Sequence, residues 1–487
     1  MIYDSLAKLN DGIRGILEIN GNRVEVSDGD KLRQTLVDDL VYSAVFSPSV
    51  DVRDVARWLI RRTASTLGII PASTHNLYRA MGKSEVSGFT VPAMNLRGLT
   101  YESAQAVFRV ALKGKVGPFI FEIARSEIGY TEQRPAEYAA VISGAAVKTG
   151  YRGPLFLQGD HFQVSAKRFA VEPEKELGAV SALVEEAIEA GFYNIDIDSS
   201  TVVDLSKPTI KEQQHNNFRI AADMTALIRQ LEPDGITVSV GGEIGEVGGK
   251  NSTVEELEAF MEGYLEELAK KGKGLEGISK ISVQTGTSHG GVVLPGGTIA
   301  RVKIDFDTLE LLSRVARERF GLAGAVQHGA STLPDEAFDK FPKTGTAEIH
   351  LATGFQNIIF DSPFFPEALR NKIYDYLRTK LAEERSPKDT EEQFIYKTRK
   401  KAFGLFKEEI WNLPPAILRE IGRELEAKFA FLFEKLNVFD TQDQVSKYVT
   451  ASDIPVAAPA ALKGGKAPGP ERRTVPPAAA DRYDEGE

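Results

Sequence analysis

The sequence contains no cysteine, and this absence removes several classes of site at once. A disulfide-stabilised scaffold, a thiolate zinc site and a cysteine nucleophile are all excluded. Any bound metal therefore has to be held by His, Asp or Glu. Histidine is also scarce, with six among 487 residues, so the position of each one can be considered individually.

Basic surface and long apolar segments are lacking as well. The formal net charge is −10, which argues against a nucleic-acid partner. The N-terminal stretch MIYDSLAKLNDGIRG has no basic segment followed by an apolar run, and no stretch approaches the ~20 apolar residues that a membrane span requires. We therefore expect a cytoplasmic protein with neither a nucleic-acid nor a membrane partner.

What the sequence does have, from Gly88 onward, is an alternation of short apolar runs with longer helical ones. The apolar runs are FTVPAMN, GPFIFEIA, GPLFLQGD, YNIDIDSS, ITVSVGGEIG, GISKISVQTG, GAVQHGAS and TAEIHLATG. The stretches between these runs have apolar residues at helical spacing, and one predicted helix begins with a Thr253-x-x-Glu256 capping box. About eight strands alternating with helices predict an α/β fold, a (β/α)8 TIM barrel rather than an open doubly wound sheet.

The predicted barrel accounts for only part of the chain. We assign residues 1–85 to an N-terminal extension, 86–365 to the barrel, 366–450 to a C-terminal helical extension and 451–487 to a tail. The tail is rich in Pro, Ala and Gly and is expected to be disordered, because it cannot bury enough apolar surface to fold. The basic run YKTRKKAFGLFKEEIW in the helical extension is interpreted as a solvated helix face or a subunit contact.

Polar residues end or follow several predicted strands, and in a barrel the carboxyl ends of the strands form the active-site face. These residues are Asp160, His161, Asp198, Glu243, His289 and His328. A divalent metal is the simplest explanation for three His and three carboxylates on one rim, because an open three-His site leaves coordination positions for substrate. His75 and His215 fall outside this pattern and are interpreted as structural or surface residues.

Glycine-rich stretches accompany the later His residues. SHGGVVLPGG and QHGAS place small residues where backbone N–H groups can approach an anion such as phosphate. VGGEIGEVGG is not a dinucleotide-binding fingerprint, because the GxGxxG spacing before a helix is absent. The glycines therefore favour a phosphorylated small molecule as the ligand.

Taken in order, FTVPAMN, GDH, IDIDSS, GGEIGEVGG, SHGG and QHGAS resemble the class II (metal-dependent) ketose-bisphosphate aldolases, between Gly88 and Asp361. The resemblance implies that one catalytic Zn²⁺ is held by His161, His289 and His328. It also implies that Asp160 is the general acid/base, and that Asp198 and Glu243 bind a second or displaced metal. The positions that match substrate-contacting and phosphate-contacting residues are Asn95, Gly290, Gly329, Ser331 and Thr353.

The activity that this resemblance implies is reversible retro-aldol cleavage. Fructose-1,6-bisphosphate or tagatose-1,6-bisphosphate would yield dihydroxyacetone phosphate and glyceraldehyde 3-phosphate, a reaction of glycolysis and carbohydrate metabolism. The metal would polarise the ketose carbonyl, while Asp160 would remove the C4 hydroxyl proton in cleavage and return it in condensation. We expect a lyase that acts as a homo-oligomer on a small sugar phosphate or ketose.

Some positions depart from the family pattern. Leu294 stands where family members often carry Lys, and His350 and Ala352 replace the Asn and Asp of the closing strand motif. These changes weaken the case for a bisphosphate substrate more than the case for a metal. FIFEIARSEIGYT and LQGDHFQ are also similar to the Z-type subunit of tagatose-bisphosphate aldolase and, more distantly, to the tagaturonate/fructuronate epimerases.

Three alternatives therefore stay open beside the aldolase. The first is a metal-dependent ketose or keturonate epimerase, and the second is a Schiff-base aldolase whose nucleophile is Lys280. The third is a non-catalytic subunit that stabilises another aldolase chain. The sequence leaves undecided the C4 configuration, the phosphorylation of the substrate, the oligomeric state, the role of the N-terminal extension and the identity of the divalent metal.

Overall fold

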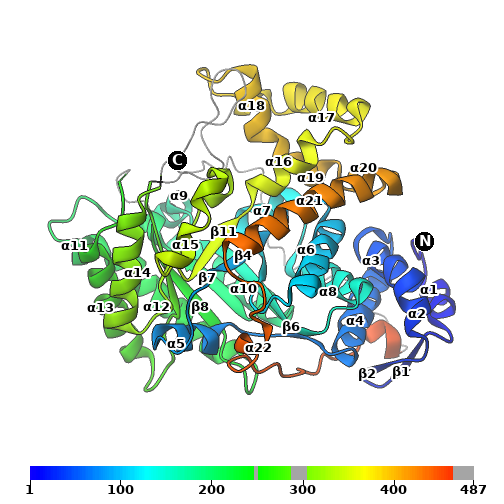
Figure 1. Cartoon of the computed structure of the whole chain (residues 1–487), viewed down its shortest axis with the longest axis horizontal. Helices are drawn as coiled ribbons and strands as arrows, with labels where there is room; N and C mark the ends of the chain where they lie inside the picture. The colour runs from blue at the N-terminus through cyan, green and yellow to red at the C-terminus, as the bar shows by residue number, and fades with distance from the viewer. Residues whose placement is uncertain (246–249, 287–303, 464–487) are drawn as a thin grey trace.

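The computed structural model describes residues 1–245, 250–286 and 304–463, and its centre is a closed ring of eight parallel strands (Figure 1). The strands are β4 (Val91–Asn95), β5 (Ile120–Ala124), β6 (Gly153–Gln163), β7 (Asn194–Asp198), β8 (Ser239–Gly245), β9 (Lys280–Val283), β10 (Ala325–Gln327) and β11 (Glu348–Leu351). Each strand pairs with the next along the chain, and β11 pairs with β4 to close the ring. The predicted (β/α)8 barrel is confirmed.

Helices connect the strands and surround the ring (Figure 1). They are α6 (Thr100–Gly114), α7 (Arg125–Thr131), α8 (Pro135–Thr149), α9 (Ala166–Val171), α10 (Pro173–Glu189), α11 (Ile210–Gln213), α12 (His215–Leu231), α13 (Val254–Lys271), α14 (Phe306–Phe320), α15 (Lys340–Lys343) and α16 (Thr353–Asp361). The predicted capping box is present, since Thr253 and Glu256 cap the start of α13. Local sequence therefore sets where this helix begins.

Strand β6 contains an irregularity that affects the site. The sequence places the end of this strand at Asp160 and His161, but the strand continues to Gln163, and its register with β7 shifts between Gly159 and Phe162. Within this bulge His161 has a φ of 39°, in the left-handed region. Glycine is required at 159, because a Cβ there would collide with the Phe162 ring.

The barrel interior contains a buried charged network. The Nζ of Lys280, on β9, lies 2.9 Å from Asp196 Oδ2, 2.5 Å from Glu348 Oε1 and 2.8 Å from Gln158 Oε1. Burial alone would lower the pKa of Lys280, but the Asp196 and Glu348 carboxylates raise it. The amine is therefore a charged structural group, which disfavours the Schiff-base alternative because a nucleophilic lysine has to be deprotonated and accessible.

Replacing Lys280 by Met is expected to lower the free energy of unfolding by about 3–5 kcal/mol, because it leaves buried carboxylates without their cation. Urea unfolding followed by circular dichroism measures this change. The matched control is Lys211→Met, since Lys211 makes an exposed ion pair with Glu266 whose loss costs about 0–1 kcal/mol. Equal, small effects of the two substitutions would contradict the role assigned to Lys280.

The N-terminal segment packs beside the barrel and also adds a strand to it. Its elements are α1 (Leu6–Ile13), β1 (Leu17–Asn20), β2 (Arg23–Val26), α2 (Gly29–Lys31), α3 (Val37–Phe46), α4 (Val50–Thr66), β3 (Ile69–Pro71) and α5 (His75–Gly82). Helices α3 and α4 contact α8, and β3 pairs with the beginning of β6. The segment thus covers one side of the barrel (Figure 1).

The C-terminal segment returns across the barrel. Its helices are α17 (Glu367–Lys380), α18 (Glu391–Thr398), α19 (Ala402–Leu405), α20 (Lys407–Trp411), α21 (Pro415–Lys435) and α22 (Gln442–Val445). Helix α21 packs on α6, and the backbone N–H of Thr90 donates to the carbonyl of Leu436. Among the described residues, no helix combines the length and apolar character that crossing a bilayer requires.

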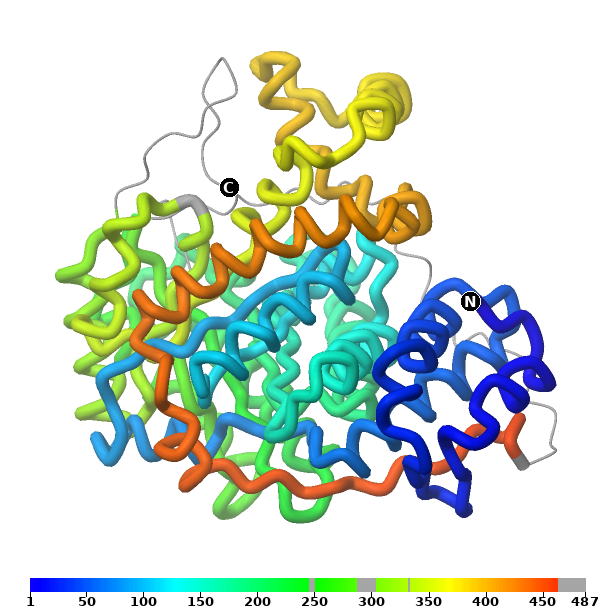
Figure 2. The backbone as a smooth tube through the Cα atoms, turned by 45° about the vertical axis from the view of Figure 1, so that its right-hand side comes forward, coloured from blue at the N-terminus to red at the C-terminus, as the bar shows by residue number. Residues whose placement is uncertain are grey.

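Residues 451–463 correct one expectation. Their composition suggested part of a disordered tail, yet in Figures 1 and 2 the chain after α22 runs along the N-terminal helices. The Trp58 indole N–H donates to the carbonyl of Val456 at 3.0 Å, and Arg62 forms an ion pair with Asp453. Composition did not reveal this, because the stretch is ordered by partners some 400 residues away in sequence rather than by a core of its own.

Candidate active site

The bulge in β6 brings two neighbouring side chains, Asp160 and His161, to the same place. In a regular strand adjacent residues point to opposite faces of the sheet. Here the register shift and the left-handed φ of His161 leave its Nε2 only 3.8 Å from Asp160 Oδ1. Left-handed backbone at a non-glycine residue costs about 1–3 kcal/mol and is concentrated at functional sites.

Two further carboxylates face His161 from the next two strands. Its Nδ1 lies 3.0 Å from Asp198 Oδ2 and 3.1 Å from Glu243 Oε2. Burial alone would lower the pKa of His161, but Asp160 and Glu243 raise it well above its usual value. Burial, followed by the Asp198 charge, raises the pKa of Glu243 to about 7. The negative field that favours a proton on His161 would equally favour a divalent cation in the proton's place.

His328 follows β10 and stands between two other imidazoles. Its ring centroid is 4.1 Å from that of His161 and 4.1 Å from that of His350. Its Nδ1 lies 4.0 Å from Asp160 Oδ1, and its Nε2 is 2.9 Å from the Ser282 hydroxyl. The three rings are therefore packed at the same end of the barrel as Asp160.

These residues fit a metal ion. Ligand atoms of Asp160, His161 and His328 lie within 4.8 Å of one another, and the same holds for His161, Asp198 and Glu243. Nitrogen and carboxylate donors gathered at such distances suit a divalent metal ion. The third predicted ligand, His289, and the neighbouring Gly290 lie outside the described residues.

A second group of charged residues, deeper in the barrel interior, contacts Asp160. His350 Nδ1 lies 3.0 Å from Asp160 Oδ1 and 3.1 Å from Glu122 Oε2, while its Nε2 lies 2.6 Å from Glu348 Oε1. Burial alone would lower the pKa of His350, but Glu122 and Asp160 raise it well above its usual value. Asp160 is thereby connected through His350 and Glu348 to the Lys280 network.

Our sequence reasoning did not select Glu122, Asp196 or Glu348 as site residues, and it noted His350 only as a departure from the family pattern. A signal for them was present. Each is a polar residue inside or at the start of an otherwise apolar barrel strand, as in FIFEIA and EIHL. A charge at such a position is buried in the barrel and therefore needs a partner.

Four of the predicted substrate-contacting residues lie at the carboxyl ends of β4, β10 and β11: Asn95, Gly329, Ser331 and Thr353. Asn95 donates from Nδ2 to the Glu127 carboxylate, and the Ser331 hydroxyl accepts the Ala352 backbone N–H at 2.6 Å. Gly329 has a φ of 67°, in the left-handed region, directly after His328. Thr353 is buried at the start of α16. These strands are neighbours in the ring, so the residues share one sector of the rim.

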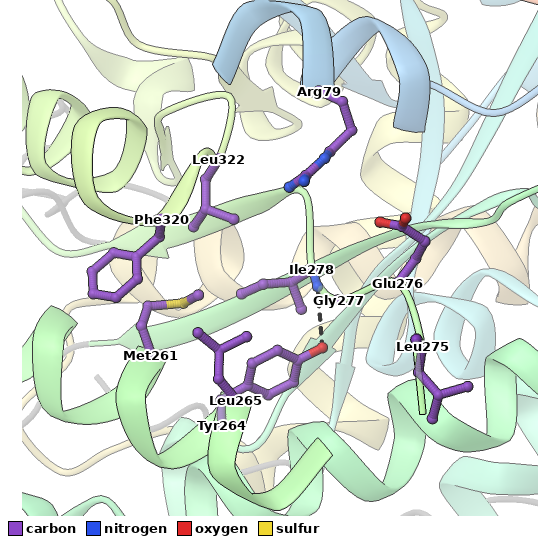
Figure 3. A pocket seen from close by; sticks show the side chains of 11 residues that line it. Arg79, Met261, Tyr264, Leu265, Leu275, Glu276, Gly277, Ile278, Phe320 and Leu322 are labelled. Atoms are coloured by element: carbon purple, nitrogen blue, oxygen red, sulfur yellow. Dashed lines mark hydrogen bonds between the residues drawn. The ribbon is translucent and has the colours of Figure 1, made fainter. Parts of the chain in front are cut away.

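A hollow at the opposite end of the barrel takes no part in this site. Its volume is about 300 Å³. Figure 3 shows its lining, which includes Arg79, Tyr264 and Phe320. It lies beside α5, which precedes β4, and beside residues 274–278, which precede β9. In a barrel this is the face that contributes to stability, whereas catalytic residues lie at the other face.

The closed parallel barrel, with His and carboxylate side chains that could hold a metal ion gathered at its carboxyl-end rim, is typical of the class of barrel enzymes, which carry their active sites at this face. Comparison with protein families narrows the class. The family model described as fructose-bisphosphate aldolase class-II matches residues 75–409. The chain belongs to the class II fructose-bisphosphate aldolase family.

Individual relatives are distant. The fructose-bisphosphate aldolase of Giardia intestinalis is 24% identical over 270 residues, covering 55% of this chain and 69% of the relative. The solved structure of fructose-bisphosphate aldolase from Campylobacter jejuni is 19% identical and covers 77% of this chain and 97% of that chain, with a TM-score of 0.45. The solved structure of the fructuronate-tagaturonate epimerase from Cohnella laeviribosi is 13% identical and covers 72% of this chain and 82% of that chain, with a TM-score of 0.51. At 13% identity the epimerase structure supports the fold alone.

Proposed function

We propose that the protein is a zinc-dependent aldolase that cleaves a ketose bisphosphate, fructose-1,6-bisphosphate or its tagatose epimer, into two triose phosphates. The observation that carries the proposal is the β6 bulge, which sets the Asp160 carboxylate against the imidazole of His161 with the His328 ring alongside. Membership of the class II aldolase family supports the reaction class.

The ligands proposed for Zn²⁺ are His161, His328 and His289, with Asp198 and Glu243 as ligands of a second or displaced ion. When bound, Zn²⁺ would supply Lewis-acid polarisation of the ketose carbonyl and stabilise the charge that develops as the C3–C4 bond breaks. Asp198 would hold His161 in orientation by accepting from its Nδ1, because a carboxylate partner fixes the tautomer of a ligating imidazole.

In cleavage Asp160 would accept the proton of the C4 hydroxyl at a carboxylate oxygen, and in condensation it would return that proton. His350, which is itself paired with Glu122, holds this carboxylate from the barrel interior, so that its oxygen is fixed before substrate arrives. Asn95, Gly290, Gly329, Ser331 and Thr353 are proposed to contact the substrate and its phosphate from the adjoining sector of the rim.

The test is triose phosphate release from fructose-1,6-bisphosphate and from tagatose-1,6-bisphosphate, with and without EDTA. Cleavage that EDTA abolishes and added Zn²⁺ restores is the expected result. Mn²⁺, Co²⁺ and Fe²⁺ are added in parallel, because other divalent ions share the same ligands. Turnover that persists in EDTA would contradict metal dependence, and a purified protein with neither metal nor turnover would favour a non-catalytic partner subunit.

A metal-dependent ketose or keturonate epimerase is the second candidate, and its main support is Leu294, which stands where family members often carry Lys. A charged imidazole bonded to Asp160 occupies a position where the family motif has Asn. Free fructose, tagatose and their uronates are therefore incubated alongside. EDTA-sensitive epimer formation without cleavage would mean that the metal proposal holds and the aldolase proposal fails.

Some expectations stay predictions. A cytoplasmic location and a homo-oligomeric state rest on composition and on the family resemblance. The division at residues 85, 365 and 450 likewise remains our proposal for the domain organisation.

A further inference from the structure

The hollow at the amino-terminal end of the barrel has walls of two kinds. Figure 3 shows the apolar side chains of Met261, Phe320 and Leu322 gathered at one side, whereas the charged side chains of Arg79 and Glu276 lie at another. A concave site with an apolar lining and a few polar groups is typical of small-molecule sites. The volume of about 300 Å³ is sufficient for a small ligand.

Arg79, on α5, is a cation of this lining that has few partners. Its Nη1 donates to the carbonyl of Gly321 at 3.3 Å, and within the described part of the chain this is its one hydrogen bond. No carboxylate among the same residues lies within ion-pair distance of its guanidinium, and the nearest ion-pair partner of Glu276 is His75, at 3.6 Å. A guanidinium carries five N–H donors and is always charged. Donors of Arg79 are therefore left for an anion that enters the hollow.

The backbone of residues 276–278, which forms part of the lining, is fixed by its neighbours. Arg229 donates from Nε to the carbonyl of Glu276 at 2.7 Å and from Nη2 to the carbonyl of Gly277 at 3.3 Å. The backbone N–H of Ile278 donates to the Tyr264 hydroxyl at 3.1 Å, the bond drawn in Figure 3. The hollow is thus formed without a ligand, which lowers the cost of ordering it on binding.

The position of the hollow separates its occupant from the proposed reaction. Arg79 directly follows Tyr78, whose hydroxyl donates to Glu348, and Ile278 precedes Lys280 by two residues. An occupant would therefore contact residues adjacent in sequence to the buried charged network. It would not contact the rim, because the hollow lies at the opposite end of the barrel. The ligand of the hollow is for this reason not the substrate of the proposed aldolase.

We propose that this hollow is a second binding site, which takes a small carboxylic acid with an aromatic or apolar body. Arg79 pairs with the carboxylate, because the planar guanidinium matches the geometry of a planar carboxylate. Met261, Phe320 and Leu322 contact the apolar body. Glu276, with 54% of its side chain exposed, disfavours more highly charged anions such as phosphate esters. The proposal goes beyond the proposed function and does not depend on it.

Binding of three matched probes to the full-length protein tests the site without turnover. The probes are 3-phenylpropionate, the uncharged 3-phenylpropan-1-ol and phenyl phosphate, and isothermal titration calorimetry measures each Kd. We expect 3-phenylpropionate to bind with a Kd below about 10 mM, a modest affinity for a ligand of this size. The alcohol and the phosphate ester should bind more weakly. Tighter binding of phenyl phosphate than of 3-phenylpropionate would contradict the ligand class.

Replacing Arg79 by Gln is expected to raise the Kd of 3-phenylpropionate about tenfold or more, the loss that corresponds to one hydrogen bond between charged groups. The Kd of the uncharged alcohol should be unchanged. The matched control is Arg61→Gln, because Arg61, on α4, also donates to a backbone carbonyl, that of Glu189, and lies outside the hollow. It should leave every Kd unchanged.

A second variant keeps the test decisive if Arg79→Gln does not fold. Leu265 lines the hollow with 46% of its surface exposed, so its replacement removes little from the core. Leu265→Asp should raise the Kd of 3-phenylpropionate, because it removes an apolar contact and adds a repelling charge. Leu112→Asp, at a position 43% exposed on α6, should leave that Kd unchanged. Circular dichroism confirms that each variant is folded.

Wild-type protein that does not bind 3-phenylpropionate would overturn the site, as would a Kd that neither Arg79→Gln nor Leu265→Asp changes. Binding should also be equal with and without EDTA, and binding that EDTA abolishes would place the probe at the catalytic rim instead. Failure of this site is distinguishable from failure of the proposed function. Metal-dependent cleavage without probe binding refutes the site alone, whereas Arg79-dependent binding without cleavage refutes the proposed reaction alone.

Discussion

Replacing Asp160 by Asn is expected to lower kcat for cleavage by about 10²–10⁴-fold, the usual contribution of a general acid/base. The amide keeps the shape of the carboxylate but cannot accept the C4 hydroxyl proton as a base. His161 and His328 are unchanged in this variant, so it should still purify with its metal. The measurements are kcat with fructose-1,6-bisphosphate and zinc content by atomic absorption.

Asp204→Asn provides the control for Asp160→Asn. Asp204 is an exposed carboxylate that pairs with Ser206 and Lys207, and its loss should leave kcat unchanged. A kcat for Asp160→Asn within threefold of wild type would show that another group transfers the proton. Loss of the metal together with activity would instead show that Asp160 serves chiefly as a ligand, which the 4.8 Å grouping with His161 and His328 also permits.

Replacing His328 by Ala is expected to weaken zinc binding by more than about 100-fold, because even residues that only orient a ligand contribute 10–100-fold to metal affinity. Activity at limiting zinc should be lost with the metal. A ligand that binds only the folded state stabilises a protein, and the stabilisation grows with the ratio of ligand concentration to Kd. Zinc should therefore raise the melting temperature of the wild type. The same zinc concentration should raise the melting temperature of His328→Ala much less.

His215→Ala is the matched control, since His215 lies exposed at the start of α12 and outside the metal-binding groups. Its zinc stoichiometry and zinc-dependent melting shift should equal those of the wild type. If His328→Ala retained the zinc content and the melting shift of the wild type, the metal would have to lie elsewhere. Circular dichroism of the zinc-free proteins separates loss of metal from loss of fold.

The barrel itself could be predicted from the sequence, because its signals are local. Apolar runs of strand length, separated by helices of regular periodicity, specify parallel strands with crossover helices, and eight such units close a ring. Capping residues such as Thr253 and Glu256 set helix starts through contacts three residues apart. The position of residues 451–463 was not predictable in this way, because their partners are Trp58 and Arg62 at the other end of the chain.

The sequence by itself determined the candidate donors. With no cysteine and six histidines, the rim positions Asp160, His161 and His328 followed from strand ends and motif order. What only the tertiary structure decided was how these donors meet. Strand alternation would separate Asp160 from His161, and a bulge against β7 joins them. Likewise Glu122, on β5, meets His350, on β11, only in the closed ring. A charge needs a partner only when folding removes it from water, so these pairings depend on the tertiary structure and not on nearness in the sequence.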